Sequence, residues 1–137
     1  MVTDNVKAVA ADGATTLILK EDGSVYGAGY YVGNALLQGS SADVTTGFKL
    51  VTTGAKKIEY GNYHSMIIKT DNTLYIAGTD FTGLELIDTN VKSVNGSHNT
   101  GSVYVKFDGR VYGFGANTYG RFGLNHTNTI AEPTLVF

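Results

Sequence analysis

The sequence predicts an all-β fold in which three antiparallel units follow one another in a single domain. Three observations predict it: a composition that favours strands, a hairpin phrase that occurs three times, and the lack of any sustained 3.6-residue apolar period. The 137 residues include 18 glycines, nine tyrosines, six phenylalanines and a single proline. Tyrosine favours half-buried pleated surfaces, and glycine supplies tight turns. We therefore expect many short strands joined by turns.

A ten-residue phrase with a turn near its centre occurs at residues 20–29, 69–78 and 106–115. Each copy has a β-rich run before the turn and a second run after it, which is typical of an antiparallel hairpin. Asp followed by Gly or Asn favours such a turn, because these residues tolerate positive φ. The three turn dipeptides are Asp22-Gly23, Asp71-Asn72 and Asp108-Gly109.

Further short segments with a period of two flank each hairpin and predict additional strands. The segments that precede the hairpins are 6–10, 57–60 and 91–94, and the candidate fourth strands are 48–51, 84–87 and 134–137. Three or four short strands per unit, recurring every 40–50 residues, are the pattern of β-propeller blades. We place the blades at residues 1–47, 48–88 and 89–137.

The repeats resemble those of the regulator-of-chromosome-condensation family of β-propellers. The family phrase contains Gly-x-x-His-Ser, an apolar strand, Asp-Gly-x-Val-Tyr, an aromatic-Gly pair and Asn-x-x-Gly-x-Leu-Gly. The second repeat carries Gly61-Asn62-Tyr63-His64-Ser65, and the third carries Phe114-Gly115 followed by 117–123, Asn-Thr-Tyr-Gly-Arg-Phe-Gly. The resemblance implies a propeller fold, and it implies a structural hydrogen bond of His64 within its own blade.

The sequence also departs from this family. It has no tryptophan, and Thr15-Thr16 and Gly101-Ser102 stand where the family has His-Ser. The family's propellers usually have seven blades, whereas this chain offers three repeats. Its best-known activity, nucleotide exchange on a small GTPase, depends on loops that nothing here matches, so we do not carry that activity over.

Three blades leave an arc with two exposed ends, because propellers close with about four to eight blades. The terminal segments 6–10 and 133–137 read as parts of incomplete repeats. Bare edge strands tend to pair with other chains. We therefore expect self-association through the terminal strands, or assembly into a larger particle. The alternatives are a fragment of a longer polypeptide and an arc that a different protein completes.

The composition disfavours nucleic-acid binding, catalysis, metal binding and membrane insertion. The formal charge of −2 gives no electropositive surface of the kind that a nucleic-acid partner requires. The chain has no cysteine, and its three histidines, His64, His98 and His126, lie far apart. The Asp residues of the turns follow the repeat, as turn geometry demands, and form no catalytic pair. No segment is long and apolar enough for membrane insertion. We expect no enzyme activity, no metal and no cofactor.

The candidate contact residues lie in loops, where tyrosine is an effective contact residue because it is amphipathic and loses little entropy. They are Tyr30, Tyr31, Tyr63, Tyr119, Asn117 and Arg121. The long loops 39–47 and 117–129 are the candidate contact surfaces. The competing interpretation is that these tyrosines cap strand ends and pack between blades.

The resulting hypothesis is a non-enzymatic binding or structural module that contacts proteins or surface glycans through its loops. The composition, rich in Gly, Thr, Asn and Tyr, suits an exposed protein of a bacterial cell surface or a phage virion, such as a tail component. The alternative is an intracellular scaffold or a GTPase-regulator-like propeller fragment. A carbohydrate-active enzyme is disfavoured, because Glu59, Glu85 and Asp88 form no convincing pair.

Overall fold

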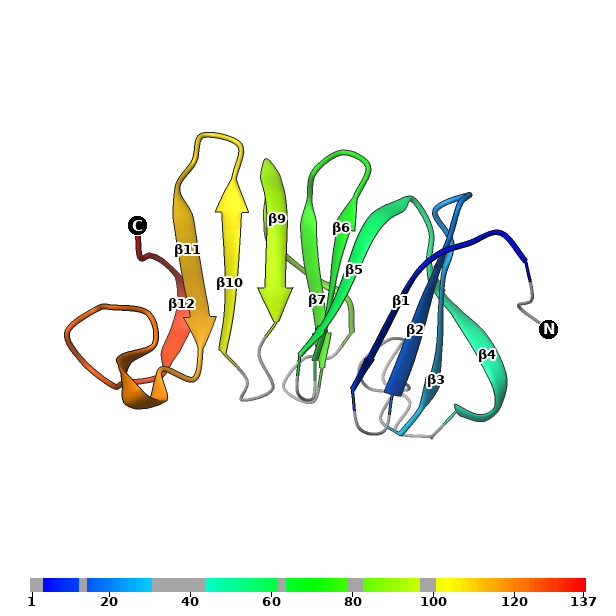
Figure 1. Ribbon diagram of the computed structural model, residues 1–137, viewed down its shortest axis with the longest axis horizontal. Coiled ribbons are helices and arrows are strands. Elements are labelled where there is room, and N and C mark those ends of the chain that lie inside the picture. Colours follow the sequence, from blue (N-terminus) through cyan, green and yellow to red (C-terminus); the bar gives the residue numbers. More distant parts are fainter. Residues whose placement is uncertain (1–3, 13–14, 31–43, 62–63, 79–82, 97–100) are drawn as a thin grey trace.

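The computed structural model describes residues 4–12, 15–30, 44–61, 64–78, 83–96 and 101–137. These residues form three four-stranded antiparallel sheets and one short 3-10 helix (Figure 1). The predicted all-β fold with three repeated units is confirmed.

Each sheet uses four strands that are consecutive in the chain. The first sheet holds β1 (Val6–Asp12), β2 (Thr15–Lys20), β3 (Val25–Gly29) and β4 (Val44–Thr52). The second holds β5 (Ala55–Gly61), β6 (His64–Lys69), β7 (Leu74–Gly78) and β8 (Glu85–Asp88). The third holds β9 (Val91–Gly96), β10 (Gly101–Lys106), β11 (Val111–Gly115) and β12 (Ile130–Leu135), with the helix η1 (Thr118–Gly120) between the last two.

The sheets stand side by side like the blades of an open arc (Figure 1). Their first strands, β1, β5 and β9, contact one another along the inner side of the arc. The fourth strands, β4, β8 and β12, are the outer edges of their sheets. Among the described residues, no other sheet packs on one face of the first sheet and on one face of the third.

The three hairpin turns have the predicted geometry. The residue after each turn Asp has positive φ: +82° at Gly23, +68° at Asn72 and +88° at Gly109. Each Asp carboxylate accepts a hydrogen bond from the backbone N–H two residues further on, at 2.8 Å from Ser24, 3.0 Å from Thr73 and 3.0 Å from Arg110. The recurring aspartates therefore build the turns.

The structure shifts one predicted blade boundary and changes the interpretation of the C-terminal strand. Residues 44–52 pair with β3, so the first sheet extends past residue 47 and the second begins at Ala55. Residues 130–135 pair with β11 as the fourth strand of the third sheet. The expectation that the terminal segments belong to incomplete repeats was wrong, because each sheet takes its fourth strand from the residues that follow its own hairpin.

The core lies between the sheets as two clusters. The first joins Leu17, Leu19, Val25 and Val51 of the first sheet to Ala55, Ile58 and Ile67 of the second. The second cluster joins the second and third sheets, and its members are Met66, Ile68, Leu74, Ile76, Val91, Val94, Tyr104 and Phe114. Burial of these side chains is what holds neighbouring sheets together.

Neighbouring sheets are also joined by a repeated backbone hydrogen bond at the hairpin turns. The carbonyl of Gly23 accepts from the N–H of Ala55 at 3.0 Å, and the carbonyl of Asn72 accepts from the N–H of Val91 at 2.9 Å. We call this contact the turn junction. In both cases the donor is the first residue of the next sheet, so the junction fixes the start of each new sheet against the turn of the preceding one.

Candidate functional site

The loop 117–129 between β11 and β12 is held from within by Asn117. Its side chain has no exposed surface. The Nδ2 group donates to the carbonyl of His126 at 2.7 Å, and Oδ1 accepts from the N–H of Phe122 at 3.1 Å. Asn117 was a candidate contact residue, but the structure places its side chain inside the loop, where it positions other residues.

Phe122 anchors the same loop to the third sheet. Its ring is buried and lies against Gly113, where an added Cβ would stand 2.7 Å from the ring. Only glycine at residue 113 leaves room for the ring on this face. Asn117 and Phe122 together therefore fix the loop to the strand it leaves.

Tyr119 and Arg121 are two of the exposed side chains that this anchored loop presents. Tyr119 is 94% exposed and has φ +66°, an uncommon conformation for an aromatic residue. The Arg121 Nε donates to the carbonyl of Thr118 at 3.4 Å, and its side chain passes Gly101. An aromatic ring and a guanidinium are the two groups most often found at the centre of binding interfaces.

Tyr30, the other predicted contact tyrosine that the structure describes, does not join this surface. Tyr30 is exposed at the end of β3, and its carbonyl accepts from the Thr15 hydroxyl at 2.7 Å. Tyr30 follows β3 of the first sheet and the loop 117–129 follows β11 of the third, so the two lie at opposite ends of the arc and the structure does not bring them together (Figure 1). Tyr31 and Tyr63 lie outside the described residues.

His64 forms a hydrogen bond that the sequence did not predict. Its Nε2 lies 2.8 Å from the Ser102 hydroxyl, and both side chains are buried. Ser102 belongs to the third sheet, so this hydrogen bond links two blades. The expected bond of His64 within its own blade stays a prediction. His126 is exposed in the loop 117–129, and His98 lies outside the described residues.

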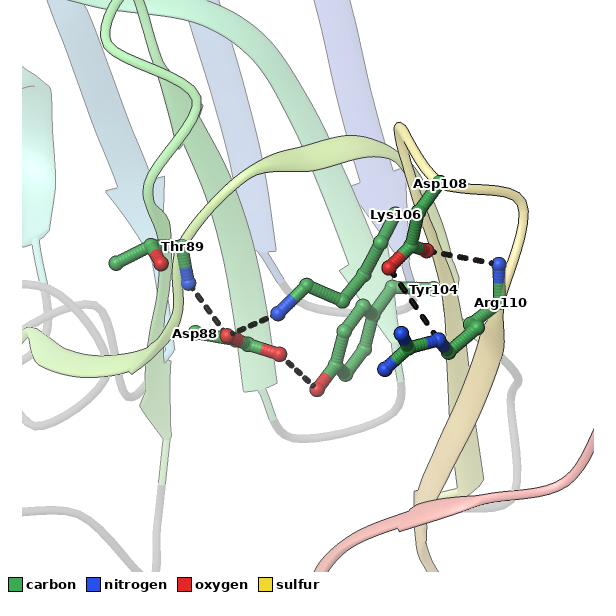
Figure 2. Close-up of polar contacts among 6 residues, drawn as sticks. All are labelled: Asp88, Thr89, Tyr104, Lys106, Asp108 and Arg110. Atoms are coloured by element: carbon green, nitrogen blue, oxygen red, sulfur yellow. Dashed lines mark hydrogen bonds and ion pairs between the residues drawn. The ribbon is translucent and has the colours of Figure 1, made fainter.

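Sequence reasoning missed a polar cluster between the second and third sheets. Figure 2 shows the Tyr104 hydroxyl and the Lys106 ammonium directed at Asp88. Tyr104 donates to Oδ2 at 2.8 Å, Lys106 donates to Oδ1 at 2.8 Å, and the N–H of Thr89 donates to Oδ1 at 2.7 Å. The sequence contained one sign of this cluster: Tyr104 occupies the repeat position at which the other two hairpins have an isoleucine, Ile18 or Ile67.

The electrostatics of this cluster fit a structural link. Partial burial opposes ionisation of Asp88, but the hydrogen bonds from Lys106, Tyr104 and Thr89 outweigh it and hold its pKa below the usual value. Burial, followed by the hydrogen bond to Asp88, raises the pKa of Tyr104 far above its usual value. The phenol therefore stays protonated and the carboxylate stays charged at neutral pH.

Among the residues that the structure describes, no group of three or more His, Asp or Glu side chains could hold a metal ion. Within the same ranges, no helix has the length and apolar content that crossing a bilayer requires.

Comparison with known families identifies the repeat. Residues 108–137 match the family model "Regulator of chromosome condensation (RCC1) repeat". This segment comprises the third hairpin turn, β11, the loop anchored by Asn117 and β12. The resemblance seen in the sequence is confirmed, and the exposed pair Tyr119 and Arg121 belongs to the matched RCC1 repeat.

Solved structures show the same fold over nearly the whole chain. Prp20p from Saccharomyces cerevisiae superimposes with a TM-score of 0.81 at 21% identity, covering 97% of this chain and 38% of Prp20p. Human WBSCR16 gives a TM-score of 0.80 at 15% identity, covering 97% of this chain and 40% of that protein. Yeast RCC1 (Prp20), solved bound to Kap60, gives 0.71 at 16% identity, covering 95% and 37%. The chain thus spans about two fifths of the length of these three proteins and has the fold of a partial RCC1-like propeller.

Proposed function

We propose that this chain is a non-enzymatic binding module that holds a protein partner through the anchored loop 117–129. The observation that carries the proposal is the 94% exposure of Tyr119 on a loop fixed from within by the buried Asn117. A fixed loop loses little conformational entropy when a partner binds, so its exposed aromatic and cationic groups contribute more of their contact energy to affinity.

The similar structures support a protein as the partner. Prp20p was solved in a study that describes its binding to Gsp1p and histones, and yeast RCC1 (Prp20) was solved bound to Kap60. These partners belong to those proteins, which are longer than this chain. They favour the class of protein-binding propeller, and they also keep an intracellular scaffold or GTPase regulator as the second candidate function.

The proposed place of action is the surface of a virion or a bacterial cell, and its support is composition alone. The chain lacks cysteine and is rich in glycine and tyrosine. An exposed tyrosine can also stack on a sugar ring, so a surface glycan is the alternative ligand class for the same loop.

A binding comparison tests the proposal. The native chain, Tyr119→Ala/Arg121→Ala and the control Lys49→Ala are immobilised and exposed to an extract of the source organism or its host, and to a glycan array. Lys49 is exposed on β4, in a different sheet. We expect a protein that the native chain and the control retain and that the double variant retains about tenfold less.

Equal retention by all three chains would contradict the proposal for this loop. A glycan bound by the native chain and lost in the double variant would replace the protein by a sugar as the ligand.

A further inference from the structure

The two contacts between neighbouring sheets use the same repeat positions. Each sheet offers one face to the following sheet, which we call the outgoing face, and one to the preceding sheet, which we call the incoming face. The buried outgoing residues are Leu17, Leu19 and Val25 in the first sheet and Met66, Ile68 and Leu74 in the second. The buried incoming residues include Ile58 and Ile67 in the second sheet and Val94 and Tyr104 in the third.

The two ends of the arc carry these same positions without a partner sheet. On the outgoing face of the third sheet the equivalent residues are Val103, Val105 and Val111, and Val103 is 36% exposed. On the incoming face of the first sheet, Val9 and Ile18 are opposite each other in the register, and Val9 is 60% exposed. The end faces are thus apolar and match the pattern of the faces that pack inside the molecule.

Each end of the arc also carries one of the two backbone groups that form a turn junction: an acceptor in the third sheet and a donor in the first. Gly109 occupies the position of the acceptors Gly23 and Asn72, with the same positive φ. An added Cβ at Gly23 would stand 3.1 Å from the Ala55 carbonyl, whereas at Gly109 it would meet nothing within 4 Å. Val6 occupies the position of the donors Ala55 and Val91 at the start of its sheet.

Charge at the two ends is complementary. Inside the molecule, the Lys56 ammonium of the second sheet lies 5.6 Å from the centre of the Phe107 ring in the third. The repeat position of Lys56 is taken in the third sheet by Lys92, and that of Phe107 is taken in the first sheet by Glu21. Both are exposed. Suppose that the first sheet of a second copy packed on the third sheet in the way that the third sheet packs on the second. Lys92 would then lie beside the Glu21 carboxylate of that copy.

We propose that two copies of this chain associate head to tail, the outgoing face of the third sheet of one copy packing on the incoming face of the first sheet of the other. In this contact the Gly109 carbonyl accepts from the Val6 N–H of the partner copy, and Lys92 pairs with Glu21. Two copies bring six sheets, and closed propellers have about four to eight. If the rotation from each sheet to the next is one sixth of a turn, the same contact made twice closes a ring of six sheets.

This contact extends the proposed function by naming a second copy as a partner. Tyr119 and Arg121 are not among its repeat positions, although Phe122 of the same loop lies against Gly113, which shares the outgoing face with Val103. Partner binding by the Tyr119→Ala/Arg121→Ala variant and self-association of Val103→Glu therefore test the two proposals separately. The Tyr119→Ala/Arg121→Ala variant should associate as the native chain does, because neither residue belongs to the repeat positions of the end faces.

Sedimentation velocity over a range of concentrations tests the contact at low salt. We expect a species of twice the chain mass. Glu21→Lys and Lys92→Glu should each weaken association by about three- to tenfold, and the double variant Glu21→Lys/Lys92→Glu should recover most of the loss. Val103→Glu should weaken it by about a hundredfold, because it places a charge on an apolar contact. The control Lys49→Glu should associate as the native chain does.

Amide hydrogen exchange adds a readout of the backbone contact. The Val6 N–H should exchange more slowly at concentrations where the double-mass species forms, and Glu21→Lys should reverse this protection. A single species of the chain's own mass at all concentrations would overturn the proposal. A dimer that forms equally well in Glu21→Lys, Lys92→Glu and Val103→Glu would overturn it as well, because another surface would then hold the copies together.

Discussion

At the scale of single residues, the buried Asn117 and the partly buried Asp88 organise the structure around them. Asn117 satisfies a backbone N–H and a carbonyl within the loop that bears Tyr119. Asp88 gathers a phenol and an ammonium from the neighbouring sheet. Buried polar groups that lose one partner leave the other without a hydrogen bond, so both residues should be sensitive to substitution.

Replacing Asn117 by Ala should lower the free energy of unfolding by about 1–3 kcal/mol, because the Phe122 N–H and the His126 carbonyl lose their partner. Chemical denaturation measures this change. The control Asn128→Ala alters an exposed side chain of the same loop and should change stability by less than about 0.5 kcal/mol. Equal effects of the two substitutions would show that Asn117 does not hold the loop.

Replacing Asp88 by Asn should lower stability at neutral pH by about 1–3 kcal/mol, because the hydrogen bond with Lys106 loses its charge assistance. The pKa of Asp88 is lowered in the folded state, so its contribution is complete above the unfolded pKa of about 4 and is lost as the pH falls through the lowered value. The difference between native and variant should therefore shrink below about pH 4.

Denaturation at a series of pH values measures this difference. Asp108→Asn is the matched control, since Asp108 is an exposed carboxylate that bonds within its own turn. A gap between native and Asp88→Asn that stays constant down to acidic pH would contradict the assignment.

At the scale of elements, the repeating hairpins were readable from sequence and the partnerships between sheets were not. Asp followed by Gly or Asn marks each turn through local backbone chemistry, which acts within a few residues. The bond of His64 to Ser102 and the cluster at Asp88 join residues of different sheets. A local sequence pattern does not predict contacts between residues that lie so far apart in the chain. Asn117 looked like a surface residue because sequence does not show that its amide turns inward.

Gly96→Ala tests how closely the first strands of two sheets approach. A Cβ at Gly96 would lie 3.0 Å from the Gly61 nitrogen and 2.7 Å from the Met66 methyl carbon, and the backbone at Gly61 cannot easily move away. We expect a loss of about 1–3 kcal/mol in the free energy of unfolding. Gly83→Ala, where an added Cβ meets nothing within 4 Å, should change stability little, and denaturation curves of both variants check the contrast.

At the scale of the whole molecule, each of the two core clusters joins a pair of neighbouring sheets, so stability should be divided between the two intersheet contacts, as in other repeat proteins. Ser102→Ala removes the hydrogen bond with His64 in the contact between the second and third sheets. Hydrogen exchange should then become faster in β9 to β11, while β2 and β3 keep their protection. Uniformly faster exchange in all three sheets would instead indicate a single cooperative unit.

The turn junction has a consequence for how proteins of this kind change in length. Each junction joins a backbone carbonyl to a backbone N–H, and neither group depends on side-chain identity. A duplicate of the central unit, spliced in after residue 90, would meet an acceptor in front of it and a donor behind it without any new substitution. Because the junction uses only backbone groups, whole blades can be added to such a protein while the contacts at each junction stay the same.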